Sequence, residues 1–292
     1  MFRKTYNFSS KISYPMKTNS IINTNELYQI SNQSNLRIFD VRTGPNAKEE
    51  YQKKHLKNAV FVDLNHHLAE IDDPKDGGRH PLPKFGYFIK TLGRLGIDKD
   101  SDVVIYDDKN GANAGARFWW MLKAAGHKKV RVLNGGLQFA ESQDYPLASG
   151  DESYPETEYI SEVHDWQLPQ VWIDDVKGAA ENPEYLIVDV RESQRYKGIT
   201  EPIDLVAGHI PSAENFPFSD NLDENGLFKS PEILNEKYTE FFKNRDSNKI
   251  IFHCGSGVTA CHSLLALDYA GFELPNLYVG SWSEWSRNFD VR

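Results

Sequence analysis

The sequence contains two copies of one pattern of segments, and this internal repeat constrains the fold more than any other feature. An apolar run ending in Asp-Val-Arg occurs at Leu36–Arg42 and again at Tyr185–Arg191. Three further pairs of segments match in the same order: Asp102–Asp108 with Asn248–Cys254, Ala124–Gly136 with Tyr269–Ser281, and His55–Leu64 with His209–Phe218. Four matches in one order indicate that the chain is a duplicated unit.

Within each half, short runs rich in β-branched residues alternate with segments of helical composition. This alternation is typical of parallel α/β units. Gly115–Gly126 and Gly257–Gly271 are predicted helices, each ending at a glycine that suits a helix C-terminus. We therefore predict an α/β fold of two tandem domains, each with a small, mostly parallel sheet flanked by helices.

The predicted domains are residues 21–147 and 167–292, joined by a polar, acidic linker at residues 148–166. Residues 1–20 are basic and contain no acidic side chain. We interpret them as a disordered leader, with an organelle-targeting segment or a true start at Met16 as the alternatives.

The 292-residue chain carries a formal net charge of −9 and has two cysteines, Cys254 and Cys261. An acidic chain repels nucleic acid and anionic membranes, so neither is an expected partner. Two cysteines make no disulfide framework, which favours a reducing, cytoplasmic location. His66 and His67 have no cysteine nearby, so we expect neither a metal site nor a cofactor.

Cys254 is the residue most indicative of chemistry. It follows a predicted strand, Lys249–His253, and precedes a Gly-Ser-Gly turn and a helix that begins near Val258 and Thr259. Strand, glycine-rich turn and helix N-terminus together point backbone N–H groups at one spot. Such donors stabilise a thiolate, so Cys254 is a predicted nucleophile.

The other half of the chain has no cysteine at the corresponding place. The repeat aligns Asp108 with Cys254, so we predict a catalytically silent N-terminal domain and a site between the two domains.

Cys261 lies two helical turns beyond Cys254 among apolar residues, and we interpret it as a buried core side chain. Trp119 and Trp120 are likewise predicted core residues.

The motif CGSGVTAC at Cys254–Cys261, followed by GSWSEW at Gly280–Trp285, resembles the active-site loop and C-terminal signature of the rhodanese and mercaptopyruvate sulfurtransferase family. Gly208–Pro217 matches another landmark, and the resemblance extends from Ile21 to Phe289. It implies two rhodanese-like domains, the first of them silent. It also implies a double displacement, in which Cys254 takes a sulfur from a small anionic donor as a persulfide. Cyanide, a small thiol or a thioredoxin-like dithiol then accepts that sulfur.

The resemblance also implies roles for particular residues. The residues that would form the anion-cradling loop are Gly255, Ser256, Gly257, Val258 and Thr259. Arg195 matches a substrate-clamping arginine, which can grip a carboxylate with two hydrogen bonds. Ser256 and His80 match two members of a Ser–His–Asp relay. Asn65 stands at the aspartate position, where an amide could orient His80 without stabilising an imidazolium.

Two departures from the family pattern bear on the sulfur donor. The turn after Cys254 contains no cation, which favours mercaptopyruvate over thiosulfate. However, the mercaptopyruvate branch has a second clamping arginine in the segment that reads Gly198–His209 here, and this segment has no arginine. The donor therefore stays open between the two.

Two other functional classes are compatible with a cysteine in such a loop. A cysteine phosphatase needs an arginine six residues after its nucleophile, where this chain has Ala260. A non-catalytic persulfide carrier or binding module is the third possibility.

The pair Asp40 and Arg42 in the first half recurs as Asp189 and Arg191 in the second half. Because the pair is present in both halves, we interpret it as a structural ion pair.

Overall fold

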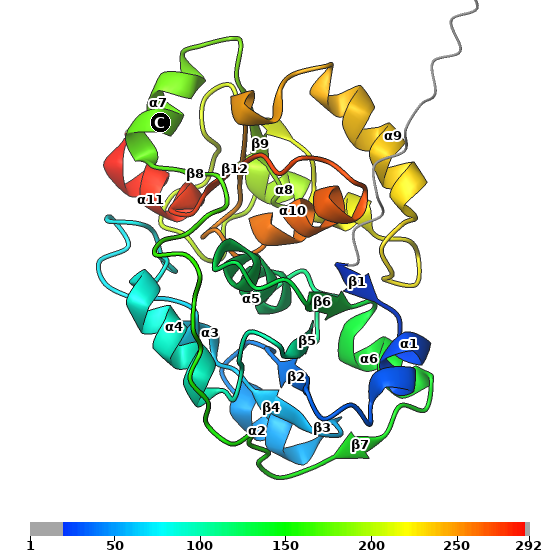
Figure 1. The fold of residues 1–292 in the computed structure, drawn as a ribbon. Helices are drawn as coiled ribbons and strands as arrows, with labels where there is room; N and C mark the ends of the chain where they lie inside the picture. The colour runs from blue at the N-terminus through cyan, green and yellow to red at the C-terminus, as the bar shows by residue number, and fades with distance from the viewer. Residues whose placement is uncertain (1–19, 290–292) are drawn as a thin grey trace, which may run out of the picture.

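The computed structural model describes residues 20–289, so the predicted leader lies outside the described residues except for Ser20. Two five-stranded sheets form the centres of two α/β domains, and the C-terminal domain lies above the N-terminal domain in Figure 1. All strand pairs within both sheets are parallel. The predicted fold class is confirmed.

The strand order is the same in both sheets once one of them is reversed. The N-terminal sheet runs β1 (Ile21–Ile22), β6 (Val130–Leu133), β5 (Asp102–Tyr106), β2 (Leu36–Asp40) and β4 (Ala59–Phe61). The C-terminal sheet runs β8 (Gln170–Val171), β12 (Asn276–Tyr278), β11 (Ile250–His253), β9 (Leu186–Asp189) and β10 (Glu214–Asn215). Each strand has a counterpart at the same place, which confirms the duplication.

Helices flank each sheet (Figure 1). Those of the N-terminal domain are α1 (Thr24–Ile30), α2 (Ala47–Lys53), α3 (Leu64–His67), α4 (Phe85–Arg94), α5 (Ala114–Ala124) and α6 (Gly136–Ser142). Those of the C-terminal domain are α7 (Ile173–Ala180), α8 (Ser193–Tyr196), α9 (Pro231–Phe242), α10 (Ala260–Tyr269) and α11 (Ser281–Asn288), with two 3₁₀ turns, η1 (Phe218–Asn221) and η2 (Ser247–Lys249). A short antiparallel pair, β3 (His55–Leu56) with β7 (Leu147–Ala148), lies beside the first sheet.

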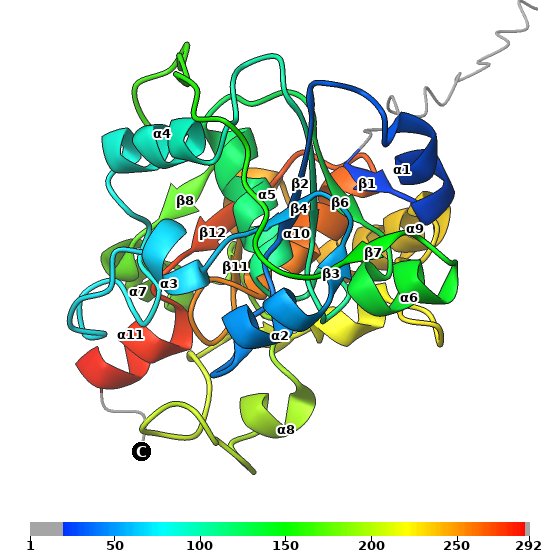
Figure 2. The ribbon, with the colours of Figure 1, turned by 90° about the horizontal axis from the view of Figure 1, so that it is seen from below.

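The two domains share one apolar core. Helices α5 and α10 pack against each other where the domains meet, and they lie together at the centre of the molecule in Figures 1 and 2. One cluster of buried side chains contains Trp119 and Trp120 of α5 together with Cys261 and Leu264 of α10. The predictions that both tryptophans and Cys261 are core residues are therefore confirmed.

The chain between β7 and β8 contains no helix or strand. It crosses the N-terminal domain, where the Thr157 N–H donates to the carbonyl of Gly93 at 2.9 Å. Tyr159 is buried, and the Tyr154 ring packs edge-on against Phe39. Within residues 20–289, no helix is both long and apolar enough to cross a membrane.

The strand register corrects the predicted equivalence of Asp108 with Cys254. Asp40 pairs with Tyr106 in the first sheet, and Asp189 pairs with His253 in the second. The residue after β5 that corresponds to Cys254 is therefore Asp107. The sequence match placed the two strands one position out of register, and the backbone pairing with β2 and β9 corrects this.

Asp107 fills its own loop with a carboxylate. One carboxylate oxygen accepts the N–H groups of Lys109 and Gly111, each at 2.8 Å, and the other accepts those of Asn113 at 3.2 Å and Gly115 at 3.1 Å. Burial raises the pKa of Asp107, and the four N–H donors oppose that rise. The N-terminal domain thus has an anion-binding loop whose anion is part of the chain.

We predict that Asp107→Ala lowers the free energy of unfolding by about 2–4 kcal/mol, because two buried and two partly buried N–H groups lose their acceptor. Urea unfolding would measure the change. Asp108→Ala is the matched control, since the Asp108 side chain is only partly buried and pairs with Lys109 at 3.8 Å. It should cost less than about 1 kcal/mol. A larger loss in Asp108→Ala than in Asp107→Ala would contradict the corrected register.

Candidate functional site

Cys254 lies at the carboxyl end of β11, in the loop that leads into α10. Its side chain is buried, and its backbone is held by the start of α11. The Cys254 N–H donates to Ser281 Oγ at 3.1 Å, and the Trp282 N–H donates to the Cys254 carbonyl at 3.1 Å. Both backbone polar groups of Cys254 are therefore fixed before any ligand binds.

The backbone N–H groups of the next five residues, Gly255 to Thr259, are unused. Across the described part of the chain, none of the five donates a hydrogen bond to another residue. Unpaired N–H groups in a buried loop are costly unless an anion or water accepts from them. In the silent domain the Asp107 carboxylate meets this need, whereas the loop after Cys254 contains no carboxylate of its own.

Two glycines let this loop approach its neighbours closely. Gly257 has φ +70°, and a Cβ there would lie 2.4 Å from the Val279 carbonyl oxygen. A Cβ on Gly255 would lie 3.1 Å from an Nη of Arg79 and 3.4 Å from an Nη of Arg195. Two guanidinium groups therefore lie against the backbone of the residue that follows Cys254.

Arg195, the predicted clamp, is held by two acidic side chains that the sequence did not point to. Its guanidinium donates to Glu201 at 2.7 Å and to Asp204 at 3.4 Å. Glu201 also accepts from Arg191 at 3.3 Å. Burial alone would raise the pKa of Glu201, but the hydrogen bonds and charge of Arg195, together with the N–H groups of Asp204 and Ile203, outweigh burial, and the pKa is lowered. Both acids orient Arg195 toward Gly255.

Arg79 is the site residue that sequence reasoning missed. It belongs to the N-terminal domain, yet its Nε donates to Asp204 of the C-terminal domain at 3.0 Å. Arg287 approaches the same Asp204 carboxylate at 3.4 Å. The Asp204 side chain is fully buried, so one carboxylate gathers three guanidinium groups beside the loop. The only signal in the sequence was the position of Arg79 directly before His80.

His80 and Ser256 meet across the domain boundary, with His80 Nδ1 2.8 Å from Ser256 Oγ. No hydrogen bond joins Asn65 to His80 within residues 20–289. The Asn65 side chain is exposed, and its N–H is bound by Asp63, which caps α3. Among the described residues, no contact supports the expectation that Asn65 orients His80.

The protonation state of His80 follows from its surroundings. Burial lowers its pKa to about 4, and the nearby positive charges of Arg79 and Arg117 act in the same direction. His80 is therefore neutral at pH 7, and its imidazole can exchange a proton with the Ser256 hydroxyl.

The remaining predicted residues also lie in or near the loop. Val258 is buried and Thr259 is partly exposed at the start of α10. The buried ion pairs Asp40–Arg42 and Asp189–Arg191 are present as predicted, and neither lies in the loop itself. No group of three or more metal-ligating side chains occurs among the described residues.

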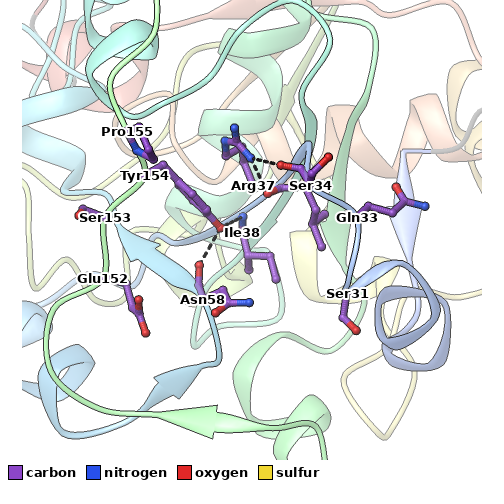
Figure 3. A pocket seen from close by; sticks show the side chains of 11 residues that line it. Ser31, Gln33, Ser34, Arg37, Ile38, Asn58, Glu152, Ser153, Tyr154 and Pro155 are labelled. Carbon is purple, nitrogen blue, oxygen red and sulfur yellow. Dashed lines mark hydrogen bonds between the residues drawn. The ribbon is translucent and has the colours of Figure 1, made fainter.

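A cavity of about 390 Å³ lies in the N-terminal domain, away from these residues (Figure 3). It is lined by the segment around Arg37, by Asn58 and by residues 152–155. The Arg37 guanidinium already donates to the carbonyls of Ser34, Leu36 and Gly96, and the Tyr154 hydroxyl donates to Asn58. None of the predicted site residues lines this cavity.

Two similar α/β domains in tandem, with an anion-binding loop at their boundary, are an arrangement that this chain shares with one known protein family. A family model described as "Rhodanese-like domain" matches residues 23–139 and 173–288. The "Probable 3-mercaptopyruvate sulfurtransferase" of Pseudomonas aeruginosa is 40% identical over 238 residues, which are 80% of this chain and 82% of that protein. The "Thiosulfate sulfurtransferase" of Cricetulus griseus is 36% identical over 245 residues, which are 82% and 80% of the two chains.

A solved structure, "3-mercaptopyruvate sulfurtransferase from Leishmania major", has a TM-score of 0.81 at 29% identity and covers 94% of this chain and 76% of that one. The chain therefore belongs to the rhodanese family and is a sulfurtransferase with two rhodanese-like domains.

We predict that His80→Gln makes the fold less sensitive to acid. The pKa of His80 is about 4 in the folded protein, against about 6.5 in an unfolded chain. Protons therefore favour unfolding as the pH falls below 6.5, and the loss, complete below pH 4, reaches up to about 3 kcal/mol. Urea unfolding at pH 7 and pH 4.5 would show a smaller difference in His80→Gln than in the wild type. The exposed His66→Gln is the control. Equal acid sensitivity in all three proteins would contradict the burial argument.

Proposed function

We propose that this sulfurtransferase takes a sulfur from 3-mercaptopyruvate onto Cys254 and passes it to a thiophilic acceptor. The observation that carries the proposal is a buried cysteine followed by five unpaired N–H groups, with two guanidinium groups above the loop. The N–H groups would hold the anionic sulfur, and the guanidinium groups would hold a carboxylate beside it.

In the first half-reaction, the Cys254 thiolate attacks the sulfur of the donor. The sulfur–sulfur bond forms as the donor's carbon–sulfur bond breaks, and pyruvate leaves as its enolate. The proton of the donor thiol finishes on the pyruvate methyl carbon. Ser256 and neutral His80, 2.8 Å apart, would carry that proton. The product is an anionic persulfide on Cys254.

The charge balance of the site favours a donor with one negative charge. Arg79, Arg195 and Arg287 are opposed by Glu201 and Asp204, which leaves one positive charge in excess. The carboxylate of mercaptopyruvate balances that charge, whereas dianionic thiosulfate exceeds it. In a partly desolvated site an unbalanced charge is unfavourable. Arg79 would supply the second clamping arginine that the segment after Arg195 lacks.

The second half-reaction would regenerate Cys254. A thiolate or cyanide attacks the outer sulfur, the sulfur–sulfur bond breaks, and Cys254 leaves as a thiolate. A thioredoxin-like dithiol would complete the cycle by closing its own disulfide.

Both cysteines of this chain are free, which suits the reducing cytoplasm that we propose as its location.

We predict that incubation with 3-mercaptopyruvate adds one sulfur, about 32 Da, to the wild-type protein. Intact-mass and peptide mass spectrometry would locate it on Cys254, because burial raises the pKa of Cys261 to about 12 and keeps it a neutral thiol. Cys261→Ser is the matched control and should gain the sulfur, whereas Cys254→Ser should not. A wild type that gains no sulfur from mercaptopyruvate or thiosulfate would refute the proposed function. A gain from thiosulfate alone would reassign the donor.

We also predict that Arg79→Gln and Arg195→Gln each raise the KM for mercaptopyruvate about 10- to 100-fold, since each removes a charge-assisted hydrogen bond to the carboxylate. The effect on kcat should be smaller. Arg94→Gln, an exposed arginine on α4, should leave both constants unchanged. Steady-state kinetics with both donors would measure this. An unchanged KM in Arg79→Gln would show that the second arginine has no part in binding.

A further inference from the structure

One charged side chain at the domain interface belongs neither to the donor clamp nor to the proton relay. Arg117 lies on α5 of the N-terminal domain and is completely buried. None of the ion pairs within residues 20–289 includes it. A guanidinium keeps its proton inside a protein, and a buried charge without a counter-charge is strongly destabilising. Some other group must therefore balance Arg117.

The contacts of Arg117 join the two halves of the candidate site. Its Nη1 donates to the Gly257 carbonyl at 3.2 Å, and its Nη2 donates to the His80 carbonyl at 3.1 Å. The Cys261 thiol donates to the same Gly257 carbonyl at 3.4 Å. Arg117 binds the Gly257 carbonyl from the side of the loop that faces the core. The N–H groups of the loop are therefore left free to bind an anion.

The groups near Arg117 that can carry a negative charge opposite its own are two sulfurs. Burial lowers the pKa of Arg117, and the negative charges that Cys261 and Cys254 can carry oppose that effect. Burial also raises the pKa of Cys261 to about 12, so Cys261 stays a neutral thiol at pH 7. The remaining sulfur is Cys254.

We propose that Arg117 is a positioning residue for the sulfur site. Its two hydrogen bonds fix the Gly257 and His80 carbonyls, and its charge balances the anion on Cys254 in both the thiolate and the persulfide. The silent domain thereby supplies the inner cation that the Gly255–Ser256 turn lacks. The inference rests on the proposed role of Cys254 as the nucleophile.

The test compares the pH dependence of Cys254 alkylation by iodoacetamide in the wild type and in Arg117→Met. The alkylation profile of the variant should move up by about one pH unit or more, because the thiolate loses a nearby positive charge. Its kcat should fall about 10- to 100-fold with little change in KM. The other groups around Cys254 that carry or can carry charge are unchanged in the variant: Arg79, Arg195, His80, His253 and Cys261.

Lys123→Met is the matched control. Lys123 lies on the same helix and forms an ion pair across the same interface with Asp268 of α10. Its loss weakens the interface without touching the loop, so the alkylation profile and kcat should match the wild type. A folded Arg117→Met with a wild-type profile would overturn the proposal, and so would an equal shift in Lys123→Met.

Arg117→Lys keeps the positive charge and serves if Arg117→Met does not fold. Its profile should stay at the wild-type pH while kcat falls, since one ammonium group cannot hold both carbonyls as the guanidinium fork does. A wild-type kcat in Arg117→Lys would overturn the positioning role. Alkylation requires no sulfur donor. A wild type that is alkylated at Cys254 but gains no sulfur would therefore refute the proposed function and leave the test of Arg117 intact.

Discussion

The need of a buried loop for an anion is the constraint on which the rest of the structure depends. After β5 and after β11, the chain passes through a loop into a helix, and among the described residues several N–H groups of each loop have no backbone acceptor. In the N-terminal domain the Asp107 carboxylate accepts four of them, so this loop is complete by itself. In the C-terminal domain the equivalent position is Cys254, whose loop keeps five N–H groups unpaired. One duplicated turn thus gives a structural loop in one copy and a candidate sulfur site in the other.

The position of the positive charges follows from the same constraint. A loop that is to hold an anionic sulfur benefits from cations, yet a long basic side chain directly after Cys254 would occupy the space where Arg79 and Arg195 meet Gly255. The cations therefore come from outside the loop. Arg195 and Arg79 approach from the outer side, and Arg117 approaches from the core. Two of these three arginines belong to the N-terminal domain, which explains in physical terms why that domain is needed although its own loop is filled.

Much of this architecture could be predicted from the sequence, because it depends on local periodicity. The apolar runs at Leu36–Arg42 and Tyr185–Arg191 gave β2 and β9, and the repeat gave the matching strand order. The boundaries were less predictable. The helix expected from Gly257 begins only at Ala260, since the φ of +70° at Gly257 keeps the loop irregular up to Thr259. The one-residue error at Asp108 arose because two short apolar strands can be matched in neighbouring registers, and only the backbone pairing with β2 and β9 distinguishes these registers.

The donor site could not be predicted in the same way, because its parts are brought together by the domain interface. Arg79 and Asp204 are 125 positions apart, and no local pattern relates them. The structure connects two features that look unrelated in the sequence, the missing arginine after Arg195 and the arginine before His80. Asp204, which lies in the segment after Arg195, binds Arg79 from the other domain and holds it beside Gly255. On the proposed function, Arg79 takes the place of the arginine that this segment lacks, and the acidic residue in the segment holds Arg79 there.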